Sequence, residues 1–201
     1  MMKRTPILYS LVALSCAIFL WSCKKDKPED PIPTVITRVV PFTYTETAVI
    51  PAAAASLFAL APAGQNVDAY DGVFETNTDA ELANEGFTRE DVISIKGKSL
   101  LTAVVNTPGQ TLDFLDTIRV SVSKKEVGSP KILFAYKYNY DLGKTSIDLD
   151  IVDVDVKDIF TSDSARIYFS GTKRAGGPYT IEPDTEINFN TTVEATVNVA
   201  Q

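Results

Sequence analysis

From residue 34 to the end of the chain, β-branched and aromatic residues alternate with polar ones at a period of two, between turn signals. This is the period of strands with one buried face, because successive side chains of a strand point to opposite sides. The alternation predicts strands over residues 35–49, 92–95, 99–105, 117–123, 131–140, 165–172 and 186–199, and a further segment over 145–160. We therefore expect an all-β fold over residues 34–201, a single antiparallel β-sandwich, immunoglobulin-like or related, of about seven to nine strands with one or two short helical turns.

The segment 145–160 changes phase. Its apolar residues stand at odd positions through Ile151 and at even positions from Val152 onward. An unbroken strand would turn its apolar face outward midway, so we expect a bulge or a strand break near Ile151 and Val152. Beyond the break, Val156, Ile159 and Phe160 have the spacing of a short helical turn.

Four stretches of the sequence are less regular. Pro41 lies inside the first strand and marks a bulge or an edge position, because proline donates no ladder hydrogen bond. Residues 52–60 are apolar and fit either a helical turn or a buried strand. The strands over 92–105 are two short ones, or one broken at Gly97, and residues 79–84 predict a short helix capped by Asp79.

The strand over 131–140 carries the densest aromatic pattern. Ile132, Phe134, Tyr136, Tyr138 and Tyr140 share one parity and hence one predicted face. One interpretation is a platform on which sugar rings stack, since tyrosine offers a flat apolar surface with a polar rim. The alternative, which we favour, is the inner face of the sandwich. Tyr136, Tyr138 and Tyr140 are therefore candidate ligand-binding residues.

Acidic residues cluster at Asp148, Asp150, Asp153 and Asp155, with Asp158 close behind. Calcium takes six to eight oxygen ligands, so this cluster is a candidate calcium site, although its spacing is not that of an EF-hand loop. The alternative, which we favour, is a solvated strand face whose charges oppose edge-to-edge pairing. We expect no cofactor other than calcium.

Composition excludes several kinds of chemistry. The chain has no histidine and only two cysteines, so a Ser-His-Asp triad and histidine-bound metals are absent. The net charge is −7, which repels phosphate backbones and disfavours nucleic acid as a partner. Carboxylates, hydroxyls, lysine, arginine and tyrosine remain, and no spacing among them indicates a catalytic site.

The N-terminus has the pattern of an export signal. Lys3 and Arg4 precede an apolar run over 6–21, which ends at Ser22 and Cys23. Leu20, Ser22 and Cys23 resemble the lipobox of bacterial lipoproteins, and the charged segment 24–30 is similar to that of surface lipoproteins of the Bacteroidota. The resemblance implies removal of residues 1–22, acylation of Cys23 by palmitate-type chains, and attachment to the outer membrane on its periplasmic or cell-surface side. A signal anchor is the competing interpretation, opposed by lysines on both sides of the run.

Residues 23–33 contain three prolines among charged residues and predict a flexible tether. Residues 147–199 bear a likeness to the β-sandwich of late-embryogenesis-abundant type 14 proteins, which implies the same fold class.

We expect a non-catalytic, membrane-anchored lipoprotein that acts as a cell-envelope binding or adhesion module for a glycan, an envelope component or a protein partner. The alternatives are a structural or assembly subunit of an outer-membrane complex and a carboxylate-based glycan hydrolase.

Overall fold

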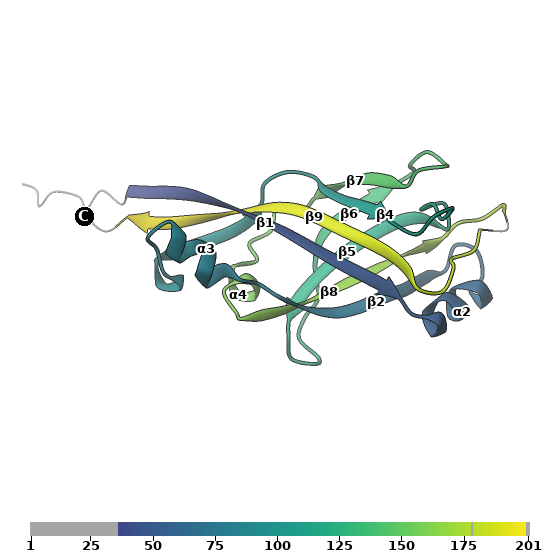
Figure 1. Cartoon of the computed structure of the whole chain (residues 1–201), viewed down its shortest axis with the longest axis horizontal. Helices are drawn as coiled ribbons and strands as arrows, with labels where there is room; N and C mark the ends of the chain where they lie inside the picture. The colour runs from purple at the N-terminus through teal and green to yellow at the C-terminus, as the bar shows by residue number, and fades with distance from the viewer. Residues whose placement is uncertain (1–35, 178, 200–201) are drawn as a thin grey trace, which may run out of the picture. The chain divides into compact units, whose positions relative to one another are not determined.

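The computed structural model describes residues 36–177 and 179–199, and over these ranges the chain forms nine antiparallel strands in one curled sheet (Figure 1). The all-β prediction is confirmed. The strands are β1 (Ile36–Ile50), β2 (Asn66–Glu75), β3 (Val92–Gly97), β4 (Leu101–Val105), β5 (Leu115–Lys124), β6 (Ile132–Tyr138), β7 (Ser146–Ile151), β8 (Ser164–Lys173) and β9 (Thr185–Val199).

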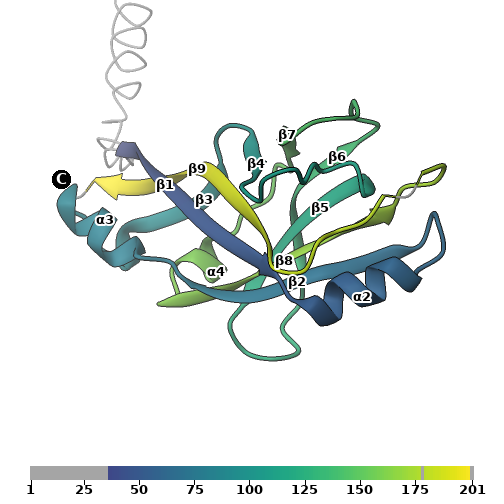
Figure 2. The same ribbon diagram turned by 45° about the vertical axis from the view of Figure 1, so that its right-hand side comes forward.

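The sheet curls into two layers. Its strand order is β1-β9-β4-β7-β6-β5-β8-β2, with β3 also paired to β9. The β7 strand joins the layers, because it pairs with β4 on one side and, through its last two residues, with the middle of β6 on the other. The layers pack face to face, and the rings of Phe169 on β8 and Phe189 on β9 meet with centroids 5.3 Å apart. The two ends of the sheet, β1 and β2, approach each other and contact without a ladder between them in the described chain (Figure 2).

The β1 strand is the longest edge of the sheet. It pairs with β9 in unbroken register from Ile36↔Val199 to Ile50↔Thr185. Its even-numbered residues face inward, and Val40, Phe42, Ala48 and Ile50 are buried. Within the described residues β1 pairs with β9 alone, so Pro41 lies in an edge strand, and the register shows no shift at this residue. Of the two predictions for Pro41, the edge position is therefore correct and the bulge is wrong.

Short helices fill the connections. They are α2 (Ala52–Leu60), α3 (Thr78–Asn84), α4 (Lys157–Phe160) and the 3-10 turn η1 (Arg89–Asp91). Residues 52–60, which fitted either a helical turn or a buried strand, form a helix that buries Phe58 against Phe114. The Lys173 ammonium group donates hydrogen bonds to carbonyl oxygens at the C-terminal end of this helix. The residue at the cap of α3 is Asn77, so the prediction of Asp79 as the cap is wrong; Asp79 instead pairs with Arg89.

The predicted break near Ile151 is confirmed, because β7 ends at that residue and α4 follows over the predicted turn. The region 92–105 forms two strands, β3 and β4. The α4 turn contacts β3 in one layer and β5 and β8 in the other, and it buries Ile159 and Phe160 between them. It therefore bridges the layers beside the β1 and β2 edges (Figures 1 and 2).

The predicted common face of the aromatic strand is wrong. In the β5–β6 ladder Val120 pairs with Ala135 and Ser121 with Leu133, so Phe134 is an extra residue in a bulge. A bulge of one residue reverses the faces of all side chains beyond it. Phe134 is buried, whereas Tyr136 and Tyr138 pair with the outward-facing Arg119 and Thr117.

Candidate functional site

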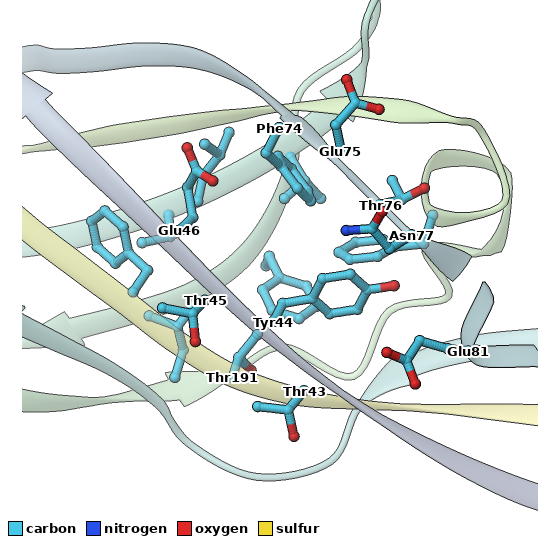
Figure 3. Close-up of a pocket in the computed structure, with 17 residues that line it drawn as sticks. Thr43, Tyr44, Thr45, Glu46, Phe74, Glu75, Thr76, Asn77, Glu81 and Thr191 are labelled. Atoms are coloured by element: carbon cyan, nitrogen blue, oxygen red, sulfur yellow. The ribbon is translucent and has the colours of Figure 1, made fainter. Parts of the chain in front are cut away.

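A cavity of about 140 Å³ lies inside the curl where the β1 and β2 edges approach each other. Its lining residues come from strands of both layers (β1, β2, β4, β5, β6, β8 and β9), from α3 and the residues just before it, and from Phe160 of α4. Figure 3 shows Tyr44 and Phe74 close to its centre, with carboxylates at three separate places around the aromatic rings. For scale, an engineered apolar cavity of about 150 Å³ binds benzene or xenon. The cavity is thus large enough for one small ring.

Four of the five aromatic side chains that line the cavity pack against one another. The ring of Tyr44 meets Phe160 edge to face, with centroids 5.0 Å apart, and Phe74 at 6.4 Å. Phe160 also packs edge to face on Phe74 at 5.9 Å, and it lies tilted against the bulged Phe134 at 6.2 Å. Edge-to-face pairs of this kind fix ring positions beyond what burial alone does. The wall is therefore preorganised, with residues drawn from both layers and from α4.

Three polar groups interrupt the inner face at this level. On β1, Tyr44 and Glu46 occupy inward positions between the buried Phe42 and Ala48. On β9, Thr191 pairs with Tyr44 in the ladder, and its buried Oγ1 has no hydrogen-bond partner among the described residues. Buried polar atoms are almost always hydrogen-bonded, so an unpartnered hydroxyl in a cavity wall marks a place where a bound group could supply the bond.

The Tyr44 hydroxyl is fixed and neutral. It hydrogen-bonds to Thr78 Oγ1 over 3.0 Å, and Thr78 donates in turn to the carbonyl oxygen of Phe160. Burial raises the pKa of Tyr44 to about 12, with the Thr78 hydrogen bond acting in the opposite direction and the charge of Glu81 adding to the rise. The phenol thus stays protonated at physiological pH and ties β1 to α3 and α4.

Glu46 is a half-buried carboxylate without a counter-charge. It faces inward because it pairs with the buried Phe189, and none of the ion pairs of the described residues includes it. Burial raises the pKa of its carboxyl above the ordinary value. Glu75 and Glu81 also line the cavity and are likewise unpaired, and no lysine or arginine lines it. The site is therefore apolar within and negatively charged at its rim.

The three predicted tyrosines separate into two environments. Tyr136 and Tyr138 lie on the outer face with ring centroids 5.0 Å apart, and Tyr138 is 43% exposed. Tyr140 is largely enclosed: its hydroxyl donates to the carbonyl oxygens of Leu112 and Leu115, Arg174 covers its ring, and burial raises its pKa. The outer pair keeps the properties of a sugar platform, whereas Tyr140 does not join it.

The structure does not bring the predicted calcium ligands together. Asp148 accepts a hydrogen bond from Thr102, Asp150 pairs with Lys137, and Asp153 pairs with Lys96. Asp155 accepts from the backbone N–H groups of Ile95 and Lys157. Over residues 36–177 and 179–199 no three acidic or cysteine side chains are grouped as a metal site requires. These aspartates act instead as separate partners along the β3, β4, β6 and β7 surface.

Cys23, the predicted site of lipid attachment, lies outside the described residues, as do the predicted signal peptide and the tether. Within the ranges that the structure covers, no helix is long and apolar enough to cross a membrane.

The residues of the cavity were not found from the sequence. One signal was present: Glu46 stands at an inward parity position in the predicted first strand, in a row with Val40, Phe42 and Ala48. An acid in an apolar row indicates either an irregular strand or a charge that serves a purpose. Phe74 and Glu75 carried no such signal, because β2 was not predicted.

Comparisons with known proteins do not identify the chain. No family model matches it, and no curated protein matches it. Among solved structures, desmodium yellow mottle tymovirus matches with 11% identity over 88% of this chain and 98% of that chain, at a TM-score of 0.28. Turnip yellow mosaic virus matches with 12% identity over 87% of each chain at a TM-score of 0.28, and a Kashmir bee virus empty particle with 10% identity over 84% of this chain and 96% of that chain, at a TM-score of 0.28. At these scores the likenesses carry no argument about function.

Proposed function

We propose that this protein is a non-catalytic binding module of the cell envelope, anchored to the outer membrane by acyl groups on Cys23, and that the cavity between β1 and β2 receives its ligand. The observation that carries the proposal is the cavity itself, with its preorganised aromatic wall and its unpartnered Thr191 hydroxyl. Ligand pockets are typically apolar with a few placed polar groups, as this one is. The lipobox-like segment ending at Cys23 supports the anchor.

The binding part of the proposal is tested with a neutral probe of one-ring size. Binding of 4-fluorobenzyl alcohol to the full chain in detergent is followed by ¹⁹F NMR, with empty micelles as the blank. Phe74→Trp adds bulk at the cavity and should weaken binding. Phe87→Trp is the matched control, because Phe87 is half-buried beside Arg38 and does not line the cavity. Equal binding by the two variants, or no binding by the parent chain at millimolar probe, would contradict a ligand site here.

The anchor is tested separately by mass spectrometry of the protein from its native membrane. The expected mass corresponds to a chain that begins at an acylated Cys23. An intact N-terminal segment with a free thiol would refute the lipoprotein assignment while leaving the cavity untouched.

A second candidate function is favoured by one observation, the exposed pair of Tyr136 and Tyr138. In the adjoining ladders this pair lies beside Arg119 and Asp150, so flat apolar rings stand next to hydrogen-bonding groups, which suits a sugar. A glycan-binding screen of the full chain and of Tyr138→Ala tests it. Binding that is unchanged in Tyr138→Ala would exclude this face as the glycan contact.

A further inference from the structure

The cavity combines an apolar interior with an unbalanced negative rim, which limits the chemistry of what it can hold. Glu46, Glu75 and Glu81 line it, no basic residue does, and none of the three takes part in an ion pair of the described chain. A negatively charged ligand would meet repulsion from all three. A neutral ligand would supply no counter-charge to Glu46, whose half-buried carboxylate faces inward beside apolar side chains.

Two other partly buried charges of the described chain are compensated by groups of the chain itself. Arg166 is bound by both carboxylate oxygens of Asp71, at 2.9 and 3.0 Å, and Lys173 donates to three carbonyl oxygens at the end of α2. Glu46 is half-buried and takes part in none of the ion pairs among these residues. A cationic ligand can therefore supply the counter-charge that Glu46 lacks within the described chain.

The aromatic wall also favours a positive charge. The faces of aromatic rings carry negative potential, and ammonium groups bind over them with a gain that increases as water is removed. Tyr44 and Phe74 lie at the cavity close to the rim acids, and Figure 3 shows Glu46 on one side of these rings and Glu81 on the other. A cation seated at the rim would thus meet ring faces and carboxylates together.

We propose, on the basis of the binding function above, that the ligand is a small organic cation: an apolar or aromatic group of about one ring in size that carries an ammonium group. The ring enters the cavity of about 140 Å³ among Tyr44, Phe74 and Phe134. The ammonium group stays at the rim, where Glu46 supplies its counter-charge. The Thr191 hydroxyl is available to a polar atom on the buried part of the ligand.

The test compares 4-fluorobenzylammonium with the neutral 4-fluorobenzyl alcohol, which has nearly the same shape, on the full chain in detergent. We expect the cation to bind about fivefold or more tightly than the alcohol at low salt, and the difference to shrink as salt is added. Glu46→Gln should lose that preference and leave the affinity for the alcohol nearly unchanged. Glu186→Gln is the matched control, because Glu186 is an exposed acid on the outer side of β9, and it should bind both probes like the parent chain.

The outcomes separate the two proposals. If the alcohol binds as tightly as the cation, or if Glu46→Gln keeps the preference, the cation inference is overturned while the cavity remains a ligand site. If neither probe binds and Phe74→Trp behaves like the parent chain, both proposals are overturned. A folding check by circular dichroism accompanies each variant. Because the Glu46→Gln change keeps the shape of the side chain, loss of the preference for the cation without loss of structure reports the charge.

Discussion

Thr185 and Thr191 stand on the same inward row of β9, yet they meet opposite conditions. Thr185 is fully buried at the end of the ladder opposite Ile50, and its hydroxyl donates to the carbonyl oxygen of Glu182 over 2.7 Å. Thr191 lies opposite Tyr44 in the middle of the strand, and its buried hydroxyl has no partner among the described residues. The inner face thus has a packed end where Thr185 is hydrogen-bonded and a central part where the Thr191 hydroxyl and the Glu46 carboxylate have no partner among the described residues. We locate function in the central part for that reason.

The largest expected effect is the difference in stability loss between a residue of the packed core and a residue of the cavity wall. Phe169→Ala removes a fully buried ring that joins the layers through Phe189, and it should lower the free energy of unfolding by about 3 to 5 kcal/mol. Phe74→Ala widens an existing opening at an edge strand, so its cost should be about 1 to 2 kcal/mol. Urea unfolding of the full chain in detergent measures both. Equal losses would mean that the β1–β2 region is packed like the rest of the core.

Thr185→Val tests the satisfied end of the row. The change keeps the shape of the side chain and removes the hydrogen bond to Glu182, so it should reduce the free energy of unfolding by about 1.5 kcal/mol. Urea unfolding under the same conditions provides the value. A variant as stable as the parent would show that this hydroxyl is no better satisfied than that of Thr191.

Thr191→Val should act in the opposite direction. It removes a buried hydroxyl that lacks a partner, so the free energy of unfolding of the ligand-free chain should rise by about 1 kcal/mol. Sites that bind ligands commonly sacrifice stability in this way. A destabilised Thr191→Val variant would indicate that the hydroxyl is already bonded within the protein, and the comparison with Thr185 would fail.

The smallest expected effect concerns the charge of Glu46. Burial raises its folded pKa above the unfolded value, so the folded chain binds the proton more tightly. This contribution to stability is fully present below the unfolded pKa and is lost as pH rises through the folded pKa. Glu46→Gln should therefore flatten the decline of stability with rising pH and raise stability at pH 7 by less than about 1 kcal/mol, since water reaches much of the carboxylate.

Urea unfolding of the parent chain and of Glu46→Gln across the acid range measures the difference, with Glu186→Gln as the control at an exposed position. If the free energies of unfolding of the parent and of Glu46→Gln change with pH in parallel, burial does not disfavour the charged form of the Glu46 carboxyl.

The alternation of apolar and polar residues predicted most strands, because it indicates which face of a strand is buried. In β1, β8 and β9 the same parity of residues faces inward along the whole strand. The alternation failed where a bulge shifts the phase. In β6 the extra residue Phe134 moved Tyr136 and Tyr138 to the outer face. In β2 a register shift between Asp68 and Tyr70 breaks the pattern of the whole strand, which was not predicted.

The cavity could not be derived from the sequence, because it depends on two edges that are distant in the chain. Tyr44 and Glu46 come from one end of the sheet, and Phe74 comes from the other. Their approach follows from the curl of the sheet, which leaves no local pattern, and from the place of α4 between the layers, which its helical spacing alone does not give. Only the acid in the inward row of β1 pointed toward the site. The lipid anchor, by contrast, is a local motif, and it remains a prediction from residues outside the described ranges.

The most direct measurement of the central claim is a crystal structure of the protein under xenon pressure. Xenon occupies apolar cavities of about 150 Å³ and reports the space without reference to any ligand chemistry. We predict one xenon atom among Tyr44, Phe74 and Phe134, absent in crystals of Phe74→Trp. An inner face closed by its own side chains at that place, with no xenon between β1 and β2, would contradict the account.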